Sequence, residues 1–128
     1  MQSDHPLVFI VDDDSSVRNA LRRLIRAAGY EVETFATAAD FLRRDPSRGG
    51  VCLVLDIRMP GMSGLDLQRE LTARASRLPV VLITAHADAA VRQQALAGGA
   101  VDVLYKPFDD ELLLGAIERA LEREAPPS

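Results

Sequence analysis

The chain has 128 residues and a mass of 13.9 kDa, with 48% apolar, 27% charged and 5% aromatic residues. This length suits one domain, and the ordinary apolar share excludes a disordered chain and an extended coiled coil. The net charge of -4 argues against direct nucleic-acid binding by this domain, because phosphate contacts need an excess of Lys and Arg. The single cysteine, Cys52, excludes an internal disulfide, and no apolar run approaches the length of a membrane span.

Short apolar runs alternate along the chain with segments of helical periodicity. The runs LVFIV, VCLVL and VVLI are apolar without alternation, which is typical of strands covered on both faces in a parallel sheet. In chain order we expect the strand Leu7–Val11, the helix Ser15–Ala28, the strand Val32–Phe35, the helix Ala38–Arg44, the strand Val51–Leu55, the helix Gly64–Arg74, the strand Val80–Ile83, the helix Asp88–Ala97, the strand Val101–Leu104 and the helix Asp109–Glu122.

Two of the expected helices differ in how firmly they should pack. The helix Ser15–Ala28 has a full apolar stripe, with Asp14 or Ser15 as its cap and Gly29 as its terminator. The helix Asp88–Ala97 has the thinnest apolar stripe of the set. We therefore expect it to be the least firmly docked.

Alternating strands and helices predict right-handed crossovers and a three-layer α/β fold. We expect residues 7–122 to form the domain, residues 1–6 to be a flexible N-terminus, and residues 123–128 to be a tail or the start of a linker. In such a fold, ligands bind outside the carboxyl ends of the strands. The strand ends are therefore the places to look for function.

Polar side chains follow four of the five expected strands. Asp12, Asp13 and Asp14 follow the first, Asp56 the third, Thr84 the fourth, and Lys106 follows Tyr105 after the fifth. Two unit charges at ~4 Å repel by about 4 kcal/mol even at an effective dielectric of 20, so the acids need cationic partners. Lys106 supplies one positive charge, and Mg²⁺, which prefers carboxylates, water and phosphate oxygens, would supply the rest. The set predicts a metal-assisted phosphoryl site.

Asp56 is the expected nucleophile of that site. It follows the most apolar central strand and precedes the turn Met59–Gly61. A carboxylate held there can attack phosphorus and form an acyl phosphate without a general base. Lys106 would neutralise oxygens of the transferring group, and the Thr84 hydroxyl would donate to one of them.

These residues occur in short motifs at the strand ends, and with them the chain resembles the receiver domain of two-component response regulators. The motifs are VDDD after the first strand, DIRMPGMSG after the third, Thr84-Ala85 after the fourth and Lys106-Pro107-Phe108 after the fifth. The resemblance covers residues 7–121. It implies a flavodoxin-like, doubly wound five-stranded parallel sheet of strand order 2-1-3-4-5 with five helices.

The resemblance also implies a role for each site residue. Asp56 would take a phosphoryl group from a histidine kinase or phosphotransfer protein. Asp13, Asp56 and the backbone carbonyl of Arg58 would bind Mg²⁺ or Mn²⁺, with Asp12 acting through water. Thr84 would be the switch hydroxyl and Lys106 the phosphate-contacting lysine.

One position departs from the family pattern. Many receivers have an aromatic residue three places before the lysine, and here that residue is Val103. Alternation along the strand points Tyr105 away from the face of Lys106, so we expect Val103 and Tyr105 to mark the output surface. Arg58 and His86 would flank the site and modulate a slow autodephosphorylation.

Two other functions compete with a phosphorylation switch. A small-molecule phosphatase of the haloacid dehalogenase type needs a second acid two residues after the nucleophile, where this chain has Arg58. A pseudo-receiver that binds partners without phosphorylation typically loses an acid or the lysine, and this chain keeps them. The resemblance is to receivers of helix-turn-helix transcription regulators, so we expect a bacterial, cytoplasmic protein with an output domain or a homodimer formed on phosphorylation, and no membrane partner.

Overall fold

The computed structural model describes residues 5–44, 50–86 and 88–124. Most of the expected flexible N-terminus and the last four residues of the expected tail lie outside these ranges. Strands and helices alternate along the chain as β1 (Leu7–Val11), α1 (Ser15–Ala27), β2 (Glu31–Phe35), α2 (Ala38–Arg43), β3 (Gly50–Asp56), α3 (Gly64–Ala73), β4 (Val80–Thr84), α4 (Ala89–Ala97), β5 (Asp102–Tyr105) and α5 (Asp110–Glu124).

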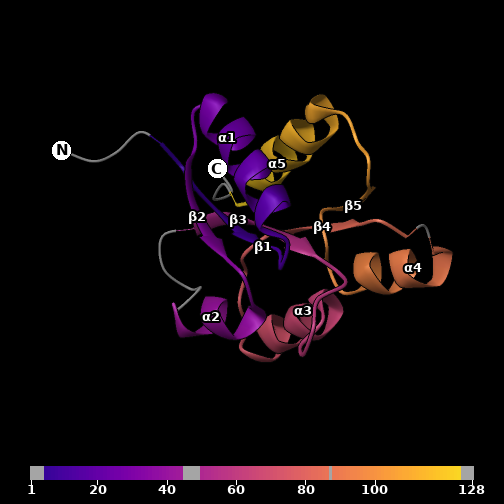
Figure 1. Cartoon of the computed structure of the whole chain (residues 1–128). Helices are drawn as coiled ribbons and strands as arrows, with labels where there is room; N and C mark the ends of the chain where they lie inside the picture. Colours follow the sequence, from indigo (N-terminus) through magenta and orange to yellow (C-terminus); the bar gives the residue numbers. More distant parts are fainter. Residues whose placement is uncertain (1–4, 45–49, 87, 125–128) are drawn as a thin grey trace.

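The five strands form one parallel sheet in the order β2-β1-β3-β4-β5. Helices α1 and α5 cover one face of this sheet, and α2, α3 and α4 cover the other (Figure 1). This is the expected three-layer, flavodoxin-like fold. β1 and β3 lie next to each other at the centre, so the residues at their carboxyl ends are neighbours.

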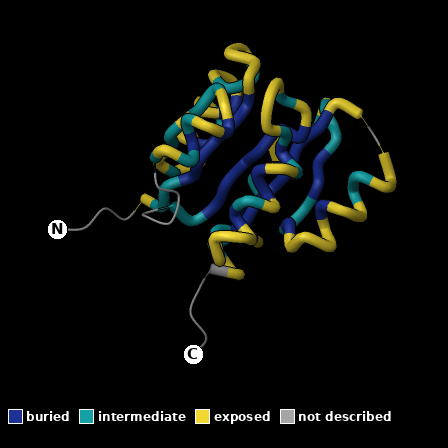
Figure 2. Tube along the Cα trace, turned by 90° about the horizontal axis from the view of Figure 1, so that it is seen from below, coloured by how far each residue is buried: buried dark blue, intermediate teal, exposed yellow. Residues whose placement is uncertain are grey.

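The sheet separates the hydrophobic core into two clusters, because successive side chains of a strand point to opposite faces. In β1, Val8 and Ile10 pack toward α1 and α5, whereas Phe9 and Val11 pack toward α2 and α3. Figure 2 shows the buried strands between helices that are exposed on their outer sides. Cys52 is fully buried in β3, and burial raises its pKa to about 12, so it is the unreactive core residue that its strand position predicts.

The helix caps explain where α1 begins. The Asp14 carboxylate accepts hydrogen bonds from the backbone N–H groups of Ser16 and Val17, which otherwise lack partners at a helix N-terminus. Leu21 and Ile25 bury the apolar side of the helix. By contrast, α4 buries only Ala95, which agrees with the thin apolar stripe of that helix.

Several elements extend beyond their apolar runs. β3 includes Asp56, β4 includes Thr84, β5 is shifted by one residue to Asp102–Tyr105, and α5 continues through Glu124 rather than ending at Glu122. Main-chain hydrogen bonds, which do not depend on side-chain polarity, set the ends of the strands: the Lys106 N–H still donates to the Thr84 carbonyl at 2.7 Å. Within the described ranges, none of the helices is both long enough and apolar enough to cross a membrane.

Candidate functional site

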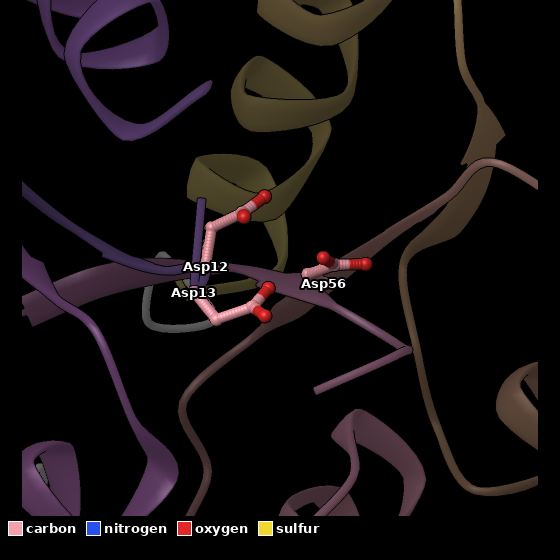
Figure 3. Close-up of side chains that lie close together, drawn as sticks. All are labelled: Asp12, Asp13 and Asp56. Atoms are coloured by element: carbon pink, nitrogen blue, oxygen red, sulfur yellow. The ribbon is translucent and has the colours of Figure 1, made fainter. Parts of the chain in front are cut away.

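Three carboxylates meet at the carboxyl edge of the sheet. Asp12 and Asp13 follow β1, and Asp56 is the last residue of β3. One oxygen from each side chain lies within 4.8 Å of the oxygens of the other two (Figure 3). The adjacency of β1 and β3 therefore brings together acids that are more than 40 residues apart in the sequence.

Lys106 adds a positive charge to this cluster. Its ammonium nitrogen lies 3.4 Å from Oδ2 of Asp12 and 3.8 Å from Oδ2 of Asp56. Its backbone N–H donates to the Thr84 carbonyl, which ties the chain after β5 to the end of β4. Lys106 thus offsets one of the three negative charges, as its place after the fifth strand predicted.

Asp12 is fully buried, and hydrogen bonds hold both its main chain and its side chain. Its N–H donates to the Phe35 carbonyl at 3.1 Å, and its Oδ1 accepts from the Asp14 N–H at 2.9 Å. Its carbonyl accepts from Nη1 of Arg18 at 2.8 Å. Sequence reasoning missed Arg18, because the periodicity of α1 shows which residues face the core but not which long side chain reaches back to the strand end.

Asp56 is 6% exposed. Burial raises the pKa of its carboxyl group above the usual value, and repulsion by Asp12 and Asp13 adds to this effect. Attraction to Lys106 and a hydrogen bond from the Arg58 N–H to Oδ1, at 3.3 Å, lower the pKa and offset part of the shift. The buried carboxylate is therefore held at an electrostatic cost that a cation would relieve.

Gly64, the first residue of α3, packs closely against the main chain of Asp56 and Ile57. The Gly64 N–H donates to the Ile57 carbonyl at 2.8 Å. A Cβ atom on Gly64 would lie 2.5 Å from the Asp56 carbonyl oxygen and 2.7 Å from Cα of Ile57. Glycine is required here because only a hydrogen fits between the start of α3 and the end of β3.

Thr84 is 2% exposed at the end of β4, and its Oγ1 accepts a hydrogen bond from the His86 N–H at 3.2 Å. The hydroxyl hydrogen remains able to donate to another acceptor. The side chains of Arg58 and His86 are exposed in the loops that follow β3 and β4.

The two residues expected to mark the output surface differ in burial. Tyr105 is half-buried and packs at the edge of the cluster under α2, α3 and α4. Val103 is only 3% exposed and belongs to that cluster itself. Its side chain is thus a core residue, and its carbonyl oxygen, which accepts from Nη1 of Arg92 at 2.9 Å, makes the link to α4.

The donor set suits a hard divalent cation. Mg²⁺ and Mn²⁺ favour carboxylate and carbonyl oxygens, and three carboxylates beside a single ammonium leave a site of negative charge. The buried Asp56 carboxylate lies beside both other acids and the Lys106 ammonium, and a carboxylate can act as a nucleophile toward phosphorus. The arrangement can thus bind a divalent cation and a phosphoryl group side by side.

Comparison with known proteins agrees with this geometry. Residues 8–118 match the family model for the response regulator receiver domain. The chain is 44% identical over 122 residues to Nodulation protein W of Bradyrhizobium diazoefficiens, which covers 95% of this chain and 54% of that protein. It is also 44% identical over 114 residues to Transcriptional regulatory protein TdiR of Thauera aromatica, which covers 89% of this chain and 50% of that protein.

Among solved structures, FixJ-N is similar in fold, with a TM-score of 0.87 and 40% identity over 99% of this chain and 100% of that chain. The chain spans about half the length of the curated relatives that it matches. The family match covers nearly all of the chain that the structure describes, and the fold has the same five-stranded parallel topology that the family implies. The chain therefore belongs to the response regulator receiver domain family.

Proposed function

We propose that this receiver is a switch in which Asp56 takes a phosphoryl group from a phosphohistidine of a histidine kinase or phosphotransfer protein. The observation that carries this proposal is that the buried Asp56 carboxylate lies beside two other acids and 3.8 Å from the ammonium of Lys106. Such a position combines a nucleophile with groups that select a cation and a phosphate.

The oxygen ligands for Mg²⁺ or Mn²⁺ in this proposal are the carboxylates of Asp13 and Asp56 and the backbone carbonyl of Arg58, with Asp12 acting through water. The chemistry of the acid cluster supports this set, since all three carboxylates converge within 4.8 Å. When bound, the cation supplies positive charge that neutralises the oxygens of the transferring phosphoryl group.

The transfer itself needs few groups from the chain. A carboxylate oxygen of Asp56 forms a bond to phosphorus while the phosphorus–nitrogen bond of the phosphohistidine breaks, and its electron pair returns to the imidazole. Lys106 offsets negative charge on the phosphoryl oxygens, and the Thr84 hydroxyl donates to one of them. Since Asp56 attacks as a carboxylate, no general base is required.

Phosphorylation then places about two negative charges beside Thr84. In our proposal Thr84 and the loop after it move toward the phosphoryl group, and this movement biases the surface formed by α4, β5 and α5, including Tyr105. TdiR is a transcriptional regulatory protein about twice as long as this match, so we propose that the switch controls transcription through an output domain or a homodimer. Water later removes the phosphoryl group, with Arg58 and His86 at the entrance to modulate that rate.

The alternatives lack support. A small-molecule phosphatase of the haloacid dehalogenase type needs a second acid where the chain has Arg58. A pseudo-receiver typically lacks an acid or the lysine, whereas here the acids and the lysine are all present and the acids lie close together.

The test is incubation of the purified chain with acetyl phosphate, with Mg²⁺ or with excess EDTA, followed by intact-protein mass spectrometry. We expect one phosphoryl group on the wild type with Mg²⁺, none with EDTA, none on Asp56→Asn, and full uptake by the control Asp66→Asn. Equal uptake by Asp56→Asn and the wild type would overturn the assignment. Turnover of a chromogenic phosphate ester by the wild type would favour the phosphatase instead.

A further inference from the structure

We propose that Arg18 is a positioning residue for Asp13, and that its contact with the main chain at the end of β1 sets the affinity of the acidic site for divalent cations. This inference rests on the proposed function of the site. The contact is a hydrogen bond of 2.8 Å from Nη1 of Arg18 to the carbonyl oxygen of Asp12, made across six residues from the second turn of α1.

Asp13 needs such support because its side chain has little of its own. Its carboxylate is exposed, and within the described ranges it accepts no hydrogen bond and forms no ion pair. Asp12 and Asp56, by comparison, are buried, accept backbone hydrogen bonds and lie beside Lys106. The main chain on either side of Asp13 therefore sets where its side chain starts and from which direction its carboxylate can reach the other acids.

Hydrogen bonds hold both of those flanking peptide groups. On the N-terminal side, Arg18 binds the carbonyl of Asp12; on the C-terminal side, the Asp14 N–H donates to Oδ1 of Asp12. The Arg18 N–H also donates to the Asp14 carbonyl at 2.9 Å, as the first helical hydrogen bond of α1. Arg18 thus closes a ring between the end of β1 and the start of α1, with Asp13 inside it.

Electrostatics explains why this ring matters. The oxygens of the three acids lie within 4.8 Å of one another, so repulsion favours rotation of the exposed Asp13 toward solvent. Rotation of the Asp12–Asp13 peptide would break the bond to Arg18. Arg18 therefore keeps the Asp13 main chain in the orientation from which its carboxylate reaches Asp56 before a cation arrives, which lowers the cost of assembling the site.

The test compares Arg18→Met with Arg18→Lys and with the matched control Arg22→Met, which removes an exposed arginine one turn further along α1. Calorimetric titration with Mn²⁺ alone should give a dissociation constant about tenfold higher for Arg18→Met than for the wild type, as for other residues that orient metal ligands. Arg22→Met should bind Mn²⁺ like the wild type. Arg18→Lys should fall between the two, because lysine supplies a donor without the planar fork.

A second readout separates positioning from general stability. In phosphorylation by acetyl phosphate, the Mg²⁺ concentration for half-maximal rate should rise with Arg18→Met, while the rate at saturating Mg²⁺ stays close to that of the wild type. In EDTA, the thermal stability of Arg18→Met should differ from that of the wild type by less than the stabilisation that Mg²⁺ adds to the wild type. If Arg18→Met does not fold, the same measurements are made on Arg18→Gln and Arg18→Lys and compared with Arg22→Met.

Equal Mn²⁺ affinity for Arg18→Met and Arg22→Met would overturn the role of Arg18. Absence of Mn²⁺ binding by the wild type would instead contradict the proposed metal site, so the two failures are distinct.

Discussion

The ammonium nitrogen of Lys106 lies 3.4 Å from a carboxylate oxygen of Asp12, although the two residues are 94 positions apart in the chain. Asp12 is fully buried, so its charge has little access to water. The same ammonium lies 3.8 Å from Asp56. A single cation therefore holds two buried acids together at the carboxyl edge of the sheet.

Replacement of Lys106 by Met should destabilise the fold, because it leaves Asp12 without its charged partner. We expect a loss of about 1–3 kcal/mol in the free energy of unfolding at neutral pH, measured by urea unfolding in EDTA. The control is Arg74→Met, which removes an exposed pair with Glu70 and should cost less than about 1 kcal/mol. Similar losses for both variants would contradict a special role for Lys106.

The raised pKa of Asp56 predicts how stability depends on pH without metal. Burial and repulsion by Asp12 make the folded chain bind this proton more tightly than the unfolded chain, whose pKa is near the ordinary 3.8. Stability should therefore fall as the pH rises from 3.8 through the higher folded pKa. Asp56→Asn should remove this fall, so that in EDTA it is more stable than the wild type at neutral pH and equally stable in strong acid.

Asp66 provides a control of opposite sign. Hydrogen bonds from Ser63 lower its pKa in the folded state, so its contribution to stability is present above pH 3.8 and is lost as the pH falls through the folded pKa. Asp66→Ala should be less stable than the wild type at neutral pH, and the difference should disappear in acid. Thermal melts of Asp56→Asn and Asp66→Ala across the same pH series test the two opposite pH dependences of stability together.

Thr84→Ala should separate phosphorylation from switching. The Thr84 main chain ends β4 and pairs with β5, while the hydroxyl is the group proposed to donate to the phosphoryl oxygen. We expect Thr84→Ala to accept a phosphoryl group from acetyl phosphate but to show much smaller amide chemical-shift changes in α4 and β5. Thr84→Ser keeps the hydroxyl and should respond like the wild type. A full response by Thr84→Ala would exclude the hydroxyl from the switch.

Replacement of Gly64 and of Gly115 by alanine should have opposite effects on the free energy of unfolding. A Cβ on Gly64 would meet the main chain of Asp56 and Ile57, which cannot move without displacing the end of β3, so Gly64→Ala should cost about 1–3 kcal/mol. A Cβ on Gly115 would meet only the flexible end of Arg119 at 3.7 Å within α5. Gly115→Ala should therefore add about 0.5–1 kcal/mol to the free energy of unfolding, by urea unfolding.

Arg92 tethers α4 to β5. Its guanidinium donates to the Val103 carbonyl at 2.9 Å and lies 3.6 Å from Asp102, which also binds Arg119 of α5. Because α4 buries only Ala95, Arg92→Met should speed hydrogen exchange of the α4 amides while leaving those of α1 unchanged. Uniform acceleration across all helices would show global destabilisation instead of release of α4.

Local patterns predicted most of the fold, because the apolar runs of β1, β3 and β4 and the apolar stripe of α1 are buried as their patterns indicate. β4 and all of β3 except its first two residues are buried, and both contain continuous apolar runs, whereas the composition of α4 indicates its loose packing. The ends of the strands were less predictable. Asp56, Thr84 and Tyr105 continue main-chain pairing beyond the apolar residues, since pairing depends on the neighbouring strand.

The acids and Lys106 could be placed at one edge from the sequence, because parallel strands end on the same side of a sheet. The contacts of Arg18 and Arg92 could not, since each joins a long, flexible side chain to a carbonyl oxygen on another element. Nor does alternation tell how deeply Val103 is buried; packing of α4 over β5 decides that.

The division of the apolar interior by the sheet has a consequence for how such a domain diversifies. Side chains beneath α1 and α5 do not belong to the cluster beneath α2, α3 and α4. Substitutions on the two sides should therefore combine with additive effects on folding free energy. Core substitutions beneath α1 can therefore be tolerated without repacking the core beneath α4, and the strand ends between the two clusters are left intact.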